Sequence, residues 1–162
     1  MILRDKNIKE KIEKLRIFLF DLDGVLILRN DRNEVELIEC MKKFTEKLKD
    51  DGYYAGIITA RNNDNLTAQL NSLDNCIVVT SSFNKVKSVE KVLEELKLNF
   101  DKVLYIGDDM LDIPLLQKAG ISIAPSSARR EVKRVVDFVV DIRVNESILH
   151  TIIEMIERLK NE

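Results

Sequence analysis

The chain has 162 residues, 45% of them hydrophobic and 33% charged, which is typical of a globular protein with one substantial core. Its net charge of −2 provides no overall field to attract nucleic acid or an anionic membrane, so we expect neither as a partner. Because His150 is the only histidine and the two cysteines lack metal-ligand spacing, we expect neither a histidine-ligated zinc site nor a serine–histidine–aspartate triad.

Short apolar segments alternate with amphipathic segments along the chain. The amphipathic segments predict helices at about residues 5–15, 34–50, 63–73, 85–97, 111–118, 127–134 and 146–160. The apolar segments predict strands at about residues 16–21, 53–59, 76–80, 102–106, 121–124 and 137–140. This alternation is typical of an α/β fold, a Rossmann-like three-layer sandwich with a mainly parallel sheet between two layers of helices. We expect residues 1–162 to form a single domain.

No apolar run reaches the length of a transmembrane helix. The apolar run near the N-terminus ends at Asp21 after only a few residues, which does not fit a secretion signal. We therefore expect a cytoplasmic protein.

The end of the first predicted strand has an unusual pair of charges. Asp21 and Asp23 directly follow its apolar residues, and Gly24 allows the chain to turn there. Two carboxylates at the tip of a buried strand repel each other, and burial raises the pKa of at least one unless a cation lies between them. A divalent metal ion would relieve this repulsion. Two solvated aspartates in an ordinary turn are the alternative for this stretch.

Polar residues also follow three other predicted strands. They are Thr59 and Arg61 after the second strand, Lys85 at the helix that follows the third, and Asp108, Asp109 and Asp112 after the fourth. In a parallel sheet the carboxyl ends of the strands meet at one edge, where ligands bind. We therefore expect these side chains to form one site. Lys85 is preferred to Lys87 because the start of a helix lets its side chain lean back toward the strand ends.

These residues resemble the four motifs of the haloacid dehalogenase (HAD) superfamily, in the expected order. The matching stretches are Asp21-Leu22-Asp23-Gly24-Val25, Ile57-Ile58-Thr59, Lys85, and Gly107-Asp108-Asp109-Met110-Leu111-Asp112. The resemblance covers residues 17–112. It implies a HAD-like fold and a Mg²⁺-dependent phosphatase, a phosphoric monoester hydrolase that forms an aspartyl-phosphate.

The resemblance also implies roles for individual residues. Asp21 would be the nucleophile, and Asp23 would act first as general acid and then as general base. Mg²⁺ would be held by the carboxylates of Asp21 and Asp108 and by the backbone carbonyl of Asp23. Thr59 would donate to a phosphate oxygen, and Lys85 would place positive charge on the phosphoryl group.

Three further residues are expected around this centre. Asp109 and Asp112 would lie behind the ligands and position the waters of the metal or Lys85. Arg61 would contact the substrate at the edge of the site.

The spacing of the motifs narrows the resemblance to one group within the superfamily. Only one helix and one strand fit between Asp21 and Thr59, or between Thr59 and Lys85, so we expect no large cap domain. Length and the fourth motif resemble the 3-deoxy-D-manno-octulosonate 8-phosphate (KDO 8-phosphate) phosphatase group, whose relatives include enzymes for nine-carbon sialic-acid-type phosphates. This resemblance implies a small sugar-acid phosphate as substrate and a homotetramer, in which a hairpin after the first motif covers a neighbouring site. The chain departs from the group in residues 27–29 and 144–147, where the loop is shorter and a glycine-rich tail is absent.

Two other functions remain open from the residues. A catalytically silent HAD-fold oligomerisation module is one alternative, although it would have no reason to keep all of the motif residues. A regulator with a phosphorylated aspartate is the other, although such domains place the acidic pair and the acceptor on different strands. Metal-dependent turnover separates the phosphatase from the silent module.

Overall fold

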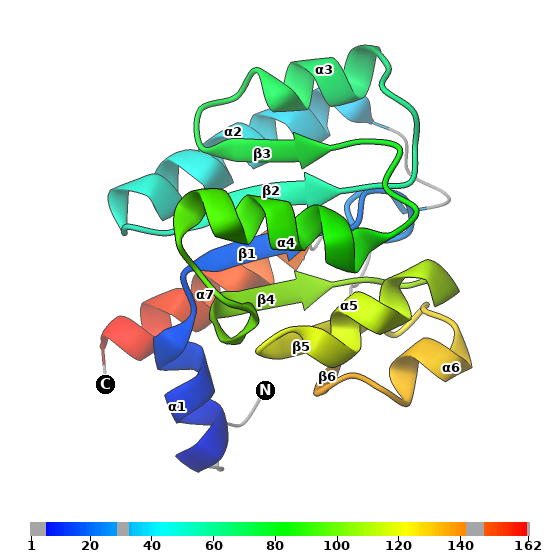
Figure 1. The fold of residues 1–162 in the computed structure, drawn as a ribbon. Coiled ribbons are helices and arrows are strands. Elements are labelled where there is room, and N and C mark those ends of the chain that lie inside the picture. Colours follow the sequence, from blue (N-terminus) through cyan, green and yellow to red (C-terminus); the bar gives the residue numbers. More distant parts are fainter. Residues whose placement is uncertain (1–5, 29–32, 142–147, 162) are drawn as a thin grey trace.

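The computed structural model describes residues 6–28, 33–141 and 148–161, and its six strands form one parallel sheet (Figure 1). The strands are β1 (Ile17–Phe20), β2 (Tyr54–Ile58), β3 (Cys76–Val79), β4 (Val103–Ile106), β5 (Ile121–Pro125) and β6 (Phe138–Val140). Their order in the sheet is β3-β2-β1-β4-β5-β6, and every neighbouring pair is parallel. The predicted α/β fold is confirmed.

Helices connect these strands and cover both faces of the sheet. They are α1 (Lys6–Lys14), α2 (Glu34–Asp50), α3 (Asn65–Asn71), α4 (Lys85–Leu96), α5 (Ile113–Lys118), α6 (Arg130–Lys133) and α7 (Ile148–Lys160), with 3₁₀ turns η1 (Phe100–Lys102) and η2 (Met110–Asp112). Helices α3, α5 and α6 are shorter than predicted. The 111–118 segment begins as the turn η2, and α6 begins only after Arg129, whose backbone is extended.

Two hydrophobic clusters, one on each face of the sheet, lie between the sheet and the helices that cover it. Side chains on a strand alternate between faces, so Phe18 and Phe20 pack into the cluster with α2, α3 and α7. Ile17 and Leu19 pack into the opposite cluster, with α4, α5 and α6. Strand β1 is thus buried on both faces, as its continuous apolar run predicted.

Side-chain caps fix the start of the helices near the carboxyl edge of the sheet. The side chain of Asp64 accepts from the Thr67 amide at the start of α3, and that of Asn84 accepts from the Lys87 amide at the start of α4. These caps hold the turns after β2 and β3 in place. The turns contain Arg61 and lead into Lys85, so the caps position residues of the expected site.

The position of β1 determines where a ligand can bind. Strands β2 and β4 flank β1, so the connections on its two sides run in opposite directions along the sheet. Ligand sites of open α/β sheets lie at such a point, beyond the carboxyl ends of the strands. Among the described residues, only a turn and α2 lie between β1 and β2, and only α3 lies between β2 and β3, as expected without a large cap.

None of the described helices has the length and apolar character needed to cross a lipid bilayer. Residue 29 and residues 144–147, where the sequence departs from the KDO 8-phosphate phosphatase group, lie outside the described residues. Residues 27 and 28 are described, and Ile27 forms an isolated bridge with Asp23.

Candidate active site

Asp21 is the first residue after β1, and it is buried at the carboxyl edge of the sheet. Its backbone amide donates to the carbonyl of Ile106, so the hydrogen bonding of β1 with β4 continues through this residue. Its Oδ1 atom accepts from the Leu22 amide at 2.8 Å and lies 3.0 Å from Lys85 Nζ. The backbone therefore holds this carboxylate beside a buried ammonium group.

Lys85 is the first residue of α4, and its side chain is only 3% exposed. Its Nζ atom lies 2.6 Å from Asp112 Oδ1 and 3.0 Å from Asp21 Oδ1. Burial lowers the pKa of Lys85, but attraction by Asp112 and Asp21 outweighs this effect, so the net pKa is raised. Lys87, the alternative in the sequence, is exposed. The structure thus brings Lys85 to Asp21.

Asp112 is fully buried and accepts four hydrogen bonds. Its Oδ1 atom accepts from Lys85 Nζ and from the hydroxyl of Tyr105, each at 2.6 Å. Its Oδ2 atom accepts from the backbone amides of Asp108 at 3.0 Å and Asp109 at 3.1 Å. A carboxylate offers about four lone-pair positions, so this side chain is saturated by its protein partners. It fixes both Lys85 and the loop that contains Asp108.

The side chain of Asp108 occupies space that only a glycine at position 24 leaves open. Gly24 has φ +87°, and a Cβ atom built on it would lie 1.8 Å from Asp108 Oδ2. The other oxygen of Asp108, Oδ1, is buried and has no hydrogen-bond partner in the described part of the chain. The loop after β1 and the loop after β4 therefore meet at Asp108, whose Oδ1 atom is available to bind a ligand.

These carboxylates form a group that fits a hard divalent cation. One oxygen from each of Asp21, Asp108 and Asp112 lies within 4.8 Å of the others. Burial, followed by repulsion from Asp112, raises the pKa of Asp21 to about 8, and burial also raises the pKa of Asp108. Oxygen donors of this kind suit Mg²⁺. Because the protein already saturates Asp112, Asp21 and Asp108 have the oxygens available for an ion.

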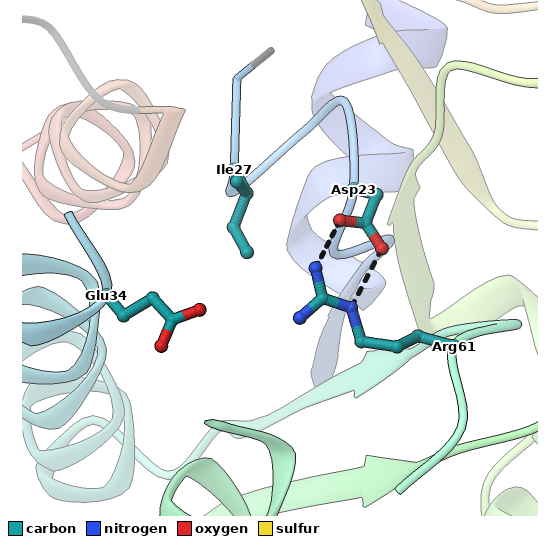
Figure 2. Close-up of a pocket in the computed structure, with 4 residues that line it drawn as sticks. All are labelled: Asp23, Ile27, Glu34 and Arg61. Atoms are coloured by element: carbon teal, nitrogen blue, oxygen red, sulfur yellow. Dashed lines mark hydrogen bonds and ion pairs between the residues drawn. The ribbon is translucent and has the colours of Figure 1, made fainter. Parts of the chain in front are cut away.

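Asp23 lies apart from this buried group, beside the outer part of the site. Its side chain is 56% exposed and forms a two-point ion pair with Arg61, with Nη2 2.6 Å from Oδ1 and Nε 3.1 Å from Oδ2 (Figure 2). Arg61 also contacts Asp64 Oδ2 at 3.2 Å. Since Asp64 caps α3, the guanidinium is held between a helix start and the loop after β1.

Thr59 follows β2 and is almost completely buried. Its backbone amide donates to the carbonyl of Val79, and its Oγ1 atom accepts from the Arg61 amide at 3.1 Å. The hydroxyl hydrogen of Thr59 can therefore be donated to a ligand oxygen at this edge of the sheet.

A pocket of about 240 Å³ lies beside the pair of Asp23 and Arg61, and Ile27 and Glu34 also line it. Figure 2 shows Glu34 and Arg61 on opposite sides of this pocket. Glu34 was not predicted as a site residue, because a glutamate at the start of an amphipathic helix has no distinguishing sequence signal.

The structure adds two observations about residues near the site, Asp109 and Tyr105. Asp109 caps the turn η2, and its Oδ1 atom lies 3.1 Å from Arg129 Nε, so this side chain is turned outward. Tyr105 was not predicted as a site residue, because it looks like an ordinary core residue of an apolar strand. Its hydroxyl group is nevertheless part of the network around Asp112.

A family model of haloacid dehalogenase-like hydrolases matches residues 62–152, more than half of the chain. The chain belongs to this family. The matched region contains Lys85 and Asp108 and begins after Thr59.

Curated relatives agree with this membership. A 3-deoxy-D-manno-octulosonate 8-phosphate phosphatase of Escherichia coli (strain B / BL21-DE3) is 28% identical to this hydrolase over 135 residues, which cover 75% of this chain and 68% of the relative. A phosphoglycolate phosphatase of Methanopyrus kandleri is 34% identical over 76 residues, which cover 47% of this chain and 33% of the relative.

The crystal structure of a 3-deoxy-D-manno-octulosonate 8-phosphate phosphatase from Moraxella catarrhalis, in complex with magnesium ion, phosphate ion and KDO, matches the fold of this hydrolase. Its TM-score is 0.78 at 20% identity, over 97% of this chain and 94% of that chain. This likeness confirms the predicted HAD-like fold. The family and the curated relatives support the predicted enzyme class, a phosphoric monoester hydrolase.

We predict that Gly24→Ala displaces the side chain of Asp108 and weakens Mg²⁺ binding by roughly ten- to a hundredfold. The new methyl group would overlap the Asp108 carboxylate, which has to move away. Isothermal titration calorimetry with Mg²⁺ measures the effect. The matched control is Gly52→Ala, because Gly52 has φ +82° and open space around it. Both variants should lose about 1–2 kcal/mol of stability from backbone strain, and equal Mg²⁺ affinity in the two would contradict the prediction.

We predict that Mg²⁺ binding displaces a proton from Asp21. Because the pKa of Asp21 is about 8, about one proton should be released at pH 7 and almost none at pH 9. Calorimetry in two buffers of different ionisation enthalpy counts these protons, and Asp21→Asn should abolish the release. Identical heats in both buffers at pH 7 would contradict the prediction.

The same pKa predicts how stability depends on pH. The folded-state pKa of Asp21 lies above the ordinary value of 3.8, so the folded protein holds the extra proton in this range. The free energy of unfolding without metal should therefore fall as the pH rises from about 4 through about 8. Mg²⁺ should remove most of this dependence.

Proposed function

We propose that the chain is a Mg²⁺-dependent phosphatase that hydrolyses a small phosphorylated sugar acid through an aspartyl-phosphate on Asp21, and that residues 1–162 form one hydrolase domain. The observation that carries the proposal is the buried contact of 3.0 Å between Asp21 and Lys85, beside the unpartnered oxygen of Asp108. A nucleophile, a fixed positive charge and metal-binding oxygens are what phosphoryl transfer requires. Family membership independently supports this chemistry.

In the first step, an oxygen of Asp21 attacks phosphorus as the bond between phosphorus and the ester oxygen breaks. Lys85 offers positive charge beside the attacking carboxylate, and Thr59 donates a hydrogen bond to a phosphate oxygen. A Mg²⁺ held by the carboxylates of Asp21 and Asp108 and the carbonyl of Asp23 would neutralise the repulsion between carboxylate and phosphate. Asp23, once a carboxylate of the substrate has replaced it on Arg61, takes up a proton and transfers it to the departing alcohol oxygen.

In the second step, water hydrolyses the aspartyl-phosphate. Asp23, now a carboxylate, takes a proton from the water as the water oxygen attacks phosphorus. The bond between phosphorus and the Asp21 oxygen breaks, which restores the carboxylate and releases inorganic phosphate. The exposure of Asp23 suits this role, because the group must meet first the departing alcohol and then water.

The pocket beside Asp23 supports a sugar acid as the departing group. Arg61 provides a planar fork that matches a carboxylate, and Glu34 provides an acceptor for hydroxyl groups across the pocket (Figure 2). Ile27 provides an apolar contact. The relative from Escherichia coli, named for a sugar-acid phosphate, supports the same substrate class.

The cytoplasmic location and the homotetramer expected from the family resemblance stay predictions. Gel filtration with light scattering tests the homotetramer.

The decisive experiment measures Mg²⁺-dependent phosphate release from sugar-acid phosphates, neutral sugar phosphates, phosphoglycolate and nucleotides. We predict turnover that falls by at least about a thousandfold in Asp21→Asn, because the nucleophile is lost. Lys85→Met should fall by at least about a hundredfold, because charge at the phosphoryl group is lost. The matched control is Lys87→Met, two residues along the same helix and exposed, which should keep its activity.

Each outcome of this experiment has a distinct meaning. Release from sugar-acid phosphates supports the whole proposal, and release from other esters alone keeps the chemistry but overturns the substrate class. A folded protein that binds Mg²⁺ and hydrolyses none of the esters would favour the silent oligomerisation module.

We predict that Arg61→Ala separates acidic from neutral substrates. Loss of the guanidinium should raise KM for a sugar-acid phosphate by about tenfold or more, whereas KM for a neutral sugar phosphate should change by less than about threefold. Steady-state kinetics on both substrates measures the difference. Arg61→Lys is the matched variant, which keeps the charge but not the planar fork, and it should recover only part of the loss. An equal change in KM for both substrates would show that Arg61 does not recognise an acidic group.

A further inference from the structure

Tyr105 brings a hydroxyl group into the most enclosed part of the site. The residue lies on β4 and is fully buried. Its hydroxyl donates to Asp112 Oδ1 at 2.6 Å and lies 3.2 Å from Lys85 Nζ, which donates to it. The rest of β4 is apolar, so a phenylalanine ring would fill the same space without a polar atom to bury. A buried hydroxyl is costly unless it is hydrogen-bonded, and here both of its hydrogen bonds are to groups of the site.

The contacts of Lys85 Nζ comprise two hydrogen bonds, to Asp112 and Tyr105, and an ion pair with Asp21. An ammonium group has three hydrogens, and three acceptors surround Lys85 Nζ. They are Asp21 Oδ1 at 3.0 Å, Asp112 Oδ1 at 2.6 Å and the Tyr105 hydroxyl at 3.2 Å. Two of these contacts point away from the nucleophile and one points toward it. The ammonium cannot rotate without breaking a hydrogen bond to a buried partner.

We propose that Tyr105 is a positioning residue, which orients the Lys85 ammonium toward Asp21 by accepting one of its hydrogens and by restraining Asp112. This inference rests on the proposed role of Lys85 in phosphoryl transfer. Without the hydroxyl, Asp112 Oδ1 loses one of its two donors and attracts Lys85 more strongly. Lys85 also loses its third acceptor. The ammonium is then free to turn toward Asp112 and away from the phosphoryl group.

The kinetic test is Tyr105→Phe, which removes the hydroxyl and keeps the ring. We expect kcat to fall by roughly ten- to a hundredfold, with KM changed by less than about threefold, because misplacement of a catalytic group acts on the reacting phosphoryl and not on substrate binding. The factor should be the same for every ester that the protein hydrolyses. The matched control is Tyr54→Phe, which lies at the start of β2, two strands away from β4, and should keep kcat.

A second measurement does not depend on turnover. In ¹⁵N-labelled protein, the ammonium hydrogens of Lys85 should give a slowly exchanging ¹H–¹⁵N signal at low temperature, with a nuclear Overhauser contact to the Tyr105 hydroxyl hydrogen. The signal should disappear in Tyr105→Phe and persist in Tyr54→Phe. The contact can be sought in the unmodified protein, so the test survives if the variant does not fold.

The two measurements separate this inference from the proposed function. An ordered ammonium in the unmodified protein, lost in Tyr105→Phe, supports the positioning even if no ester is hydrolysed. A Tyr105→Phe variant that keeps kcat within about twofold and keeps the ammonium signal overturns the inference and leaves the phosphatase intact. The inference is also overturned if cooling restores the fraction of folded Tyr105→Phe protein and restores kcat to the same extent. The hydroxyl would then contribute to stability alone.

Discussion

The site depends on a buried ammonium group that only carboxylates can keep charged. Burial by itself lowers the pKa of Lys85, because a buried position disfavours the charged form. Asp112 and Asp21 reverse this effect, and Asp112 in turn accepts hydrogen bonds from four donors, which satisfy its buried oxygens. Two of those donors are backbone amides of the loop after β4. The two ion pairs of Lys85 therefore join the start of α4, the end of β1 and the Asp108 loop into one unit.

The outer half of the site is built differently. Asp23 and Arg61 are partly exposed, and their contact is held by the cap of α3 and by the loop after β1. An exposed ion pair contributes little to stability and exchanges partners readily. A group with a carboxylate of its own can therefore compete for Arg61 without disturbing the buried unit. Because the buried unit and the outer ion pair are separate, residues around Asp23 and Arg61 can differ between relatives without a change in the buried unit.

The sequence predicts the position of a residue best where that residue follows directly from an apolar strand. Asp21, Thr59 and Asp108 could be placed together because parallel strands end at one edge, whatever the packing above them. Tyr105 could not be recognised, because an inward tyrosine in a strand looks the same whether its hydroxyl meets water or a carboxylate. Glu34 could not be recognised either, because it reaches the pocket through the angle of α2, which depends on tertiary packing. The contact of Asp109 with Arg129 could not be predicted for a related reason, since Arg129 follows a different strand.

The charges of the buried unit give a physical reason for a divalent ion. With Asp21, Asp108 and Asp112 ionised and Lys85 protonated, the unit holds an excess of two negative charges in a region of low exposure. Without an ion, burial and the neighbouring charges raise the pKa of Asp21 and Asp108, and a protonated Asp21 would be a poor nucleophile in the proposed mechanism. One divalent cation balances the excess and restores the carboxylate. In the proposed mechanism a phosphate dianion would bring two further negative charges, and a protonated Lys85 would offset part of them. The two carboxylate partners of Lys85 favour this protonated state.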